Sequence, residues 1–156
     1  MEMSSGVILY RKKENGDVEF FMCTPDGPYW KNRELWSFPK GRIEENETPF
    51  DAAIREFHEE TSIKLEGDKS KFLDLGIVNQ NKFKNVYVFA KQYNGENTDN
   101  CISNKCLTEY PPNSNKFIEH NEIKSYKWLT INELKKKGIA CYLPIYSLII
   151  RIMKYN

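Results

Sequence analysis

The chain has 156 residues and a formal net charge of +1, from 23 Lys and Arg against 22 Asp and Glu. Hydrophobic residues make up 40% of the chain and charged residues 29%, which excludes a disordered or membrane-embedded protein. The near-neutral balance gives no global field that would draw the protein to nucleic acid or to a membrane surface. We expect one domain over residues 1–156.

The chain shows no export signal, because no basic segment is followed by a long apolar run at its N-terminus. The apolar stretch 143–153 is too short to cross a bilayer and contains Arg151. We therefore expect a cytoplasmic protein whose cysteines are thiols. Cys101 and Cys106 lack the His and Cys spacing of a zinc site.

The first half of the chain predicts strands around one helix. Ser5–Arg11 and Val18–Thr24 are β-rich runs joined through Asn15-Gly16, which favours a hairpin. The next expected elements are an aromatic loop at 25–30, an apolar run at 35–38, a turn at 39–41, a helix at 49–61 and strands at 72–78 and 85–91.

The second half predicts a long loop, one strand and two helices. Residues 92–116 are polar and rich in Asn, which favours a long loop. A strand is expected at 124–129, a short helix at 131–137 and a final helix that starts at Pro144. The apolar stripe of that final helix is Ile145, Leu148, Ile149, Ile152 and Met153. Strands and interspersed helices together indicate a mixed sheet between helices.

The helix expected at 49–61 has a well-marked start. Thr48 and Asp51 have the spacing of a capping box, and Pro49 stands at the first helical position. Its apolar stripe consists of Phe50, Ile54 and Phe57.

Three carboxylates share another side of this helix. At about 100° per residue, Glu56, Glu59 and Glu60 fall within an arc of about 100°. Each pair of neighbouring carboxylates repels by roughly 3 kcal/mol at an effective dielectric constant of about 20. The spacing alone leaves two interpretations, a solvated acidic face or a partly enclosed site for a hard cation such as Mg²⁺.

The segment 41–63 has a fixed pattern, Gly-x5-Glu-x7-Arg-Glu-Phe-x-Glu-Glu-x-Ser-Ile. It resembles the signature of the Nudix hydrolases. Ser62 departs from the signature, because the family has Gly there at the end of the helix. The residues that match are Gly41, Glu47, Arg55, Glu56, Phe57, Glu59, Glu60 and Ile63.

The likeness covers nearly the whole chain. The order of segments along the chain is similar to that of a small bacterial-type subgroup of the family, which is described only as predicted nucleotide pyrophosphohydrolases. The likeness implies an α/β (α+β) fold, the Nudix-like α/β/α sandwich with a mixed central sheet. In that fold the signature forms a loop–helix–loop.

The resemblance implies a metal site and a catalytic role for part of it. Glu56, Glu59 and Glu60 would bind Mg²⁺ or Mn²⁺, together with the backbone carbonyl of Lys40. Either Glu56 or Glu60 would instead orient or deprotonate the attacking water.

A further glutamate often stands before the last strand in this family. Glu122 is our first candidate and Glu119 the second, against the alternative that both are solvated loop acids. His120 lies near them and is a candidate to assist, whereas His58 points away from the carboxylates and is expected at the surface.

Arg55 has two candidate partners. The resemblance implies that it pairs with Glu47 and so fixes the helix against the preceding loop. Arg55 and Glu47 would then belong to the catalytic residues together with Glu56 and Glu60. The alternative is a helical i,i+4 pair with Glu59.

Substrate contacts are expected on both sides of the signature. Lys40, Gly41 and Arg42 border the metal site and suit phosphate contact. Tyr29 and Trp30 are the first candidates to stack on a base. Phe83 is a further candidate, and Trp36 is more typical of a core residue.

These features predict a metal-dependent hydrolase that cleaves a pyrophosphate linkage in a nucleoside diphosphate linked to another group. Nucleoside triphosphates, dinucleoside polyphosphates and RNA 5′ ends are the candidate substrates. The near-zero charge and the lack of an extended basic segment disfavour RNA. A non-catalytic nucleotide sensor is the alternative from another class. The expected partner is a small nucleotide, with no membrane.

Overall fold

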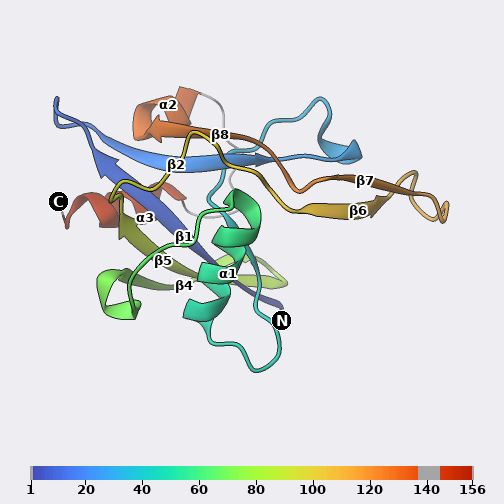
Figure 1. Ribbon diagram of the computed structural model, residues 1–156, viewed down its shortest axis with the longest axis horizontal. Coiled ribbons are helices and arrows are strands. Elements are labelled where there is room, and N and C mark those ends of the chain that lie inside the picture. Colours follow the sequence, from blue (N-terminus) through green and yellow to red (C-terminus); the bar gives the residue numbers. More distant parts are fainter. Residues whose placement is uncertain (1, 137–144, 156) are drawn as a thin grey trace.

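The computed structural model describes residues 2–136 and 145–155. Its helices are α1 (Pro49–Thr61), α2 (Ile131–Lys136) and α3 (Ile145–Met153), with short 3₁₀ helices at Pro28–Trp30 and Lys69–Lys71 (Figure 1). Its strands are β1 (Glu2–Lys12), β2 (Val18–Pro25), β3 (Lys40–Arg42), β4 (Leu73–Asn81), β5 (Lys84–Gln92), β6 (Lys105–Glu109), β7 (Phe117–Asn121) and β8 (Ile123–Thr130).

Six strands form one mixed sheet in the order β4-β5-β1-β2-β8, with β3 paired to the first half of β1. Strand β1 runs parallel to β5 and antiparallel to β2 and β3. The expected hairpin is confirmed, because Tyr10 pairs with Phe20 and Lys12 with Val18. The mixed central sheet is confirmed as well.

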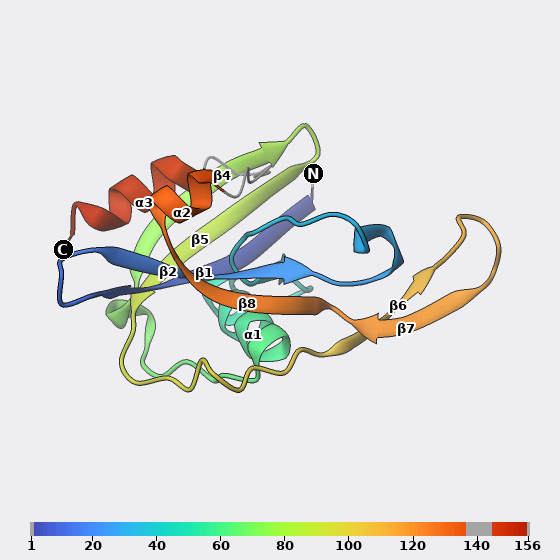
Figure 2. The same ribbon diagram turned by 90° about the horizontal axis from the view of Figure 1, so that it is seen from above.

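The sheet is covered on both faces, as the sandwich requires. Alternate side chains of β1 point to opposite faces, so Ile8 joins one apolar core and Val7 the other. Helix α1 adds Phe57 to the core on one face. Helices α2 and α3 add Leu134 and Leu148 to the core on the other face (Figure 2).

Two expectations for the loops are wrong. Residues 39–41 are not a turn, because Lys40–Arg42 form β3 and Gly41 pairs with Ser5. The loop expected at 92–116 contains β6, which pairs with β7 in a two-stranded ribbon outside the main sheet. This ribbon projects from the body of the molecule (Figures 1 and 2).

The C-terminal helix is confirmed, although its core stripe is narrower than expected. Leu148, Ile149 and Ile152 are buried, whereas Met153 is 39% exposed. The expected start at Pro144 lies outside the described residues. In the described part of the chain, no helix has the length and apolar character needed to cross a membrane.

Candidate active site

Helix α1 begins and ends as its local sequence dictates. The side-chain oxygen of Thr48 accepts a hydrogen bond from the backbone N–H of Asp51 at 3.1 Å. At the other end, Ser62 adopts the left-handed conformation with φ 67°, and its N–H donates to the carbonyl of His58 at 2.8 Å. Its hydroxyl also donates to the carbonyl of Ile102 at 2.6 Å. The serine therefore keeps the cap geometry for which glycine is usual.

Three carboxylates converge beside this helix. Glu56 and Glu60 come from consecutive turns of α1, and Glu122 from the connection between β7 and β8. One carboxylate oxygen from each lies within 4.8 Å of the others. Glu56 is 9% exposed and Glu60 is 3% exposed. We call these three residues the carboxylate triad.

Backbone hydrogen bonds hold Glu122 beside the helix. Its carbonyl accepts from the N–H of Asp26 at 2.9 Å, and its N–H donates to the carbonyl of Asn104 at 2.9 Å. The N–H of Asn104 in turn donates to the carbonyl of Glu59 at 2.8 Å. A residue 62 positions after Glu60 in sequence is thereby fixed next to it.

The other candidates near Glu122 lie elsewhere. Glu119 forms an ion pair with Lys105 at 3.7 Å on the ribbon, with its side chain 64% exposed. The ring of His120 is hydrogen-bonded to the hydroxyl of Thr108 at 2.7 Å and packs against Gly27. Neither residue belongs to the triad. His58 is exposed, as expected.

Burial and mutual repulsion make the triad a site for positive charge. Burial raises the pKa of Glu60 well above its ordinary value, and the negative charges of Glu122 and Glu56 add to the shift. Burial also raises the pKa of Glu56. The Oε2 atom of Glu60 is buried and has no hydrogen-bond partner among the described residues. An all-oxygen site with an unsatisfied buried oxygen fits a hard divalent cation such as Mg²⁺ or Mn²⁺.

Arg55 binds the acids on the adjacent side of α1. Its guanidinium donates to Glu47 at 2.8 and 3.0 Å, to Glu59 at 3.1 Å and to Glu56 at 2.9 Å. It also donates to the carbonyl of Arg42 at 3.0 Å. The hydrogen bond from Arg55 lowers the pKa of Glu47. The two pairings expected for Arg55 therefore exist together.

This network separates Glu59 from the triad. Its carboxylate is held by Arg55 and is 40% exposed, so the structure does not place it with the buried oxygens of Glu56 and Glu60. Its role as a metal ligand stays a prediction, as does that of the Lys40 carbonyl.

Gly41 lets β3 approach α1 closely. A Cβ atom at this position would lie 2.1 Å from the carboxyl carbon of Glu56. No side chain fits in that space without moving Glu56, so glycine is a steric requirement of the triad.

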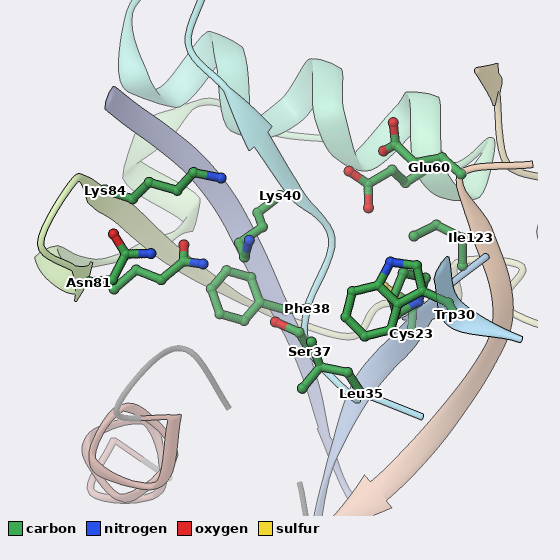
Figure 3. Close-up of a pocket in the computed structure, with 13 residues that line it drawn as sticks. Cys23, Trp30, Leu35, Ser37, Phe38, Lys40, Glu60, Asn81, Lys84 and Ile123 are labelled. Atoms are coloured by element: carbon green, nitrogen blue, oxygen red, sulfur yellow. The ribbon is translucent and has the colours of Figure 1, made fainter. Parts of the chain in front are cut away.

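A pocket of about 360 Å³ opens beside the triad (Figure 3). Glu60, Glu122 and Lys40 supply charged groups to it, and burial lowers the pKa of the Lys40 ammonium. Trp30, Leu35 and Phe38 supply apolar surface. Figure 3 shows Trp30 on the same side of Phe38 as Glu60.

Three of the expected substrate contacts do not line this pocket, namely Tyr29, Gly41 and Arg42. Tyr29 donates its hydroxyl to the carbonyl of Glu109 at 3.1 Å and packs edge-on against Tyr110, so it holds the ribbon. Arg42 has a side chain that is 71% exposed and pairs with Glu2 at 3.3 Å. Among the other aromatic candidates, Phe83 is exposed and Trp36 belongs to the core, as expected for a tryptophan in that run.

Three polar residues of the pocket were missed by sequence reasoning. Gln80 and Asn81 end β4, and Lys84 begins β5. The sequence around them shows only polar residues directly after the apolar positions of a strand. Such residues are common at hairpin turns and do not indicate a binding site. Their place in the pocket depends on the packing of β4 and β5 against the segment that contains Phe38.

Comparison with known proteins gives this site a family. A family model of the NUDIX domain matches residues 3–148. The chain belongs to the Nudix family. Its enzyme class is accordingly that of a pyrophosphohydrolase, and hydrolases of this family generally use a divalent metal.

Individual relatives agree with this Nudix assignment. An RNA pyrophosphohydrolase of Bartonella bacilliformis is 26% identical and aligns over 93% of this chain and 86% of its own length. A Nudix hydrolase structure from Listeria monocytogenes has a TM-score of 0.58 at 16% identity, over 87% of this chain and 82% of that one. A C. elegans Ap4A hydrolase complex has a TM-score of 0.51 at 21% identity, over 87% and 85%. The two structural likenesses show the shared fold.

Proposed function

We propose that this Nudix protein hydrolyses a pyrophosphate linkage in a nucleotide, with Mg²⁺ or Mn²⁺ held by Glu56, Glu60 and Glu122. The observation that carries the proposal is the carboxylate triad, whose oxygens lie within 4.8 Å of one another. Two of its members, Glu60 and Glu122, line a pocket of about 360 Å³. The intact acids also favour an enzyme over a non-catalytic sensor.

The reaction is an attack of water on one phosphorus of the linkage. The new bond joins the water oxygen to that phosphorus, and the bridging P–O bond breaks so that its oxygen leaves with the other phosphate. A divalent cation held by these carboxylates would neutralise charge on the phosphate oxygens and lower the pKa of the attacking water. Either Glu56 or Glu60 would accept the proton of that water in place of binding the cation. Arg55 and Glu47 position α1, through hydrogen bonds of 2.8 and 3.0 Å.

The pocket suits one nucleoside with its phosphates. Lys40 lines the same pocket as Glu60 and Glu122, where an ammonium group can bind a phosphate oxygen. Trp30 offers the pocket an aromatic face on which a base can stack. Its backbone is held by a hydrogen bond from Lys124 to its carbonyl at 3.1 Å. A nucleoside triphosphate or a dinucleoside polyphosphate satisfies these contacts.

A triphosphorylated RNA 5′ end is the second candidate substrate. The relative that aligns with 93% of this chain is named an RNA pyrophosphohydrolase. The net charge of +1 gives no general attraction to an RNA chain. An RNA substrate would therefore be bound mainly by its first nucleotide.

One assay tests both candidates. Purified protein is incubated with Mg²⁺ and a panel of nucleoside triphosphates, a dinucleoside tetraphosphate and a 5′-triphosphorylated oligonucleotide, and the released products are identified. We expect turnover of at least one nucleotide and none in excess EDTA. Full turnover in EDTA, or none on the whole panel, would overturn the proposal.

A further inference from the structure

The ribbon formed by β6 and β7 exposes apolar side chains to solvent. Leu107 is 65% exposed, Phe117 59% and Ile118 42%. They lie on two short strands that leave the body of the molecule (Figures 1 and 2). Soluble monomers rarely gather large exposed apolar side chains in one place, so the ribbon is suited to an interface.

The outer edge of β6 has unpaired backbone groups. In an antiparallel ladder, the N–H and C=O groups of successive residues point alternately toward the partner strand and away from it. The carbonyl of Asn104 accepts from the N–H of Glu122 at 2.9 Å, and the N–H of Tyr110 donates to the carbonyl of Lys116 at 2.8 Å. Even-numbered positions of this segment therefore face β7. The backbone groups that point the other way, and that no other described strand pairs with, belong to Lys105, Leu107 and Glu109.

The order of side chains along β6 fits a second copy of the same strand. When two copies align antiparallel about Leu107, each Lys105 lies opposite Glu109 of the other copy, and opposite charges across a ladder are stabilising. Moving the centre by one residue in either direction places Leu107 opposite Lys105 or opposite Glu109, and both ion pairs are lost. The carbonyl of Glu109 already accepts from the hydroxyl of Tyr29 at 3.1 Å, and its second lone pair can accept from the other copy.

The free edge of β7 offers no such match. Glu119 is the only Asp, Glu, Lys or Arg among the residues of β7, so no antiparallel alignment of two copies brings opposite charges together. The alignment centred on Glu119 places two carboxylates opposite each other, which is destabilising. The charge pattern therefore selects β6 as the edge that pairs.

We propose that the protein forms a two-fold symmetric dimer in which the β6 strands of two copies pair antiparallel about Leu107. The two ribbons then form one four-stranded sheet, and Leu107 packs against Leu107 of the other copy at the symmetry axis. Paired edges of five residues bury less than the about 1,200 Å² of a standard interface, so we expect a Kd of about 1 µM or weaker. The proposal is independent of the proposed function, because each copy keeps its own triad and pocket.

Sedimentation equilibrium of the full chain in reducing buffer, from about 5 to about 500 µM, measures this association. We expect a reversible equilibrium between monomer and dimer. Leu107→Asp places two carboxylates face to face at the axis and should raise Kd at least about tenfold. Lys105→Glu turns two attractive pairs into repulsive ones and should raise it about fivefold or more. Circular dichroism shows that each variant is folded.

Phe117→Asp is the matched control, because it removes an apolar side chain of similar exposure from the other strand of the ribbon. It should change Kd by less than about threefold, as an ordinary surface substitution does. A wild type that stays monomeric at every concentration would overturn the proposal. A dimer that persists in Leu107→Asp, or an equal loss in Phe117→Asp, would overturn it as well.

Disulfide cross-linking tests the register, in protein that also carries Cys106→Ser. Leu107→Cys should form a disulfide between two copies on mild oxidation, because the facing Cα atoms of such a pair are about 5.5 Å apart. Lys105→Cys should not, since its counterpart is displaced by about 13 Å along the strand. The remaining cysteines are the same in both variants and give the same background. Cross-linking through Lys105→Cys in place of Leu107→Cys would contradict the proposed pairing.

Discussion

Helix α1 handles negative charge in opposite ways on two neighbouring sides. On one side, Arg55 lies within hydrogen-bond distance of Glu47, Glu59 and Glu56 and balances much of their charge. On the other side, Glu60 faces Glu56 and Glu122 and retains a buried oxygen without a partner. Glu56 belongs to both groups and links them.

This difference explains what each side does. A balanced cluster is stable without any ligand, so its natural role is to fix the helix against β3 and the loop before it. An unbalanced and buried cluster is costly alone, because each charge loses hydration and repels the next. A bound cation would offset this repulsion and lost hydration, so the cluster is suited to bind a metal ion. Predictions that remove one charge from each side test this division of roles.

The largest effect is expected from Glu60→Gln, because it removes one charge of the triad and almost no volume. We expect kcat to fall at least a hundredfold, about 2.7 kcal/mol in activation free energy, and the increase in Tm caused by Mg²⁺ to shrink. The metal-free variant should be as stable as the wild type or more so, since repulsion in the triad is reduced.

Glu59→Gln, in the same helix, tests the prediction that Glu59 is also a metal ligand against its place beside Arg55, where its side chain is 40% exposed. A fall in kcat of less than tenfold would leave the metal to the triad. If Glu60→Gln retained more than about a tenth of kcat, a loss under about 1.4 kcal/mol, Glu60 would not be a metal ligand. If Glu59→Gln were equally damaging, the two sides of α1 would not be separate.

Arg55→Ala removes the cation from the balanced side. We expect a loss of about 2 kcal/mol in the free energy of unfolding, between the values for exposed and buried ion pairs, because three carboxylates lose their partner. Activity should also fall, since α1 is no longer fixed against β3. Chemical denaturation measures the stability change. Arg42→Ala, which removes a mostly exposed pair with Glu2, should cost under about 1 kcal/mol; an equal loss in both variants would contradict the network.

A second balanced pair, beside the C-terminal end of α1, shows how such charges depend on pH. Lys91 and Glu96 are 3.0 Å apart, with side chains 8% and 9% exposed. Burial alone would raise the pKa of Glu96, but hydrogen bonds from the backbone N–H of Asn94 and from Lys91 outweigh it and leave the pKa lowered. A carboxyl group with a lowered pKa stabilises the folded state at pH values above its ordinary pKa. This stabilisation is lost as the pH falls through the lowered pKa.

Glu96→Gln should therefore cost about 1.5–2 kcal/mol in the free energy of unfolding near pH 7, the lower part of the range for a hydrogen bond to a charged group. The difference between variant and wild type should shrink as the pH falls from the ordinary glutamate pKa through the lowered value, below which the wild-type carboxyl is also neutral. Denaturation curves across this pH range provide the measurement. A difference that stayed constant down to pH 2 would show that the charge of Glu96 is not what stabilises the loop.

The balanced side of α1 was predictable from sequence, and much of the pocket was not. The helix cap at Thr48 and the pair between Arg55 and Glu59 depend on short, fixed separations, so local rules suffice for them. The contact between Arg55 and Glu47 was implied by the resemblance to the Nudix signature. Strand β6 was missed because its partner β7 follows a polar turn and both strands are largely exposed, with Leu107 at 65% and Phe117 at 59%.

The remaining misses have the same physical origin. Glu122 was the first candidate and Glu119 the second, and only the register of the ribbon decides which one reaches α1. Gln80 was missed because a bulge cannot be read from alternation in one strand. Pairing between distant segments, which sets both registers, has no local signature.

The smallest effect is expected at Ser62, the residue at which α1 ends. Its left-handed backbone costs about 1 kcal/mol for a residue with a Cβ. Its hydroxyl offsets this cost, since it donates to the carbonyl of Ile102 at 2.6 Å and a hydrogen bond contributes about 1 kcal/mol net.

Ser62→Gly removes both the backbone cost and the hydrogen bond, so we expect the free energy of unfolding to change by less than about 0.5 kcal/mol. Ser62→Ala removes only the hydrogen bond and should lose about 1 kcal/mol. Thermal unfolding of the two variants measures the difference, and an alanine variant as stable as the glycine variant would show that the hydroxyl contributes nothing. The expected order means that the serine is a second solution to the same cap, one that also ties the end of α1 to the segment leading to Asn104 and Glu122.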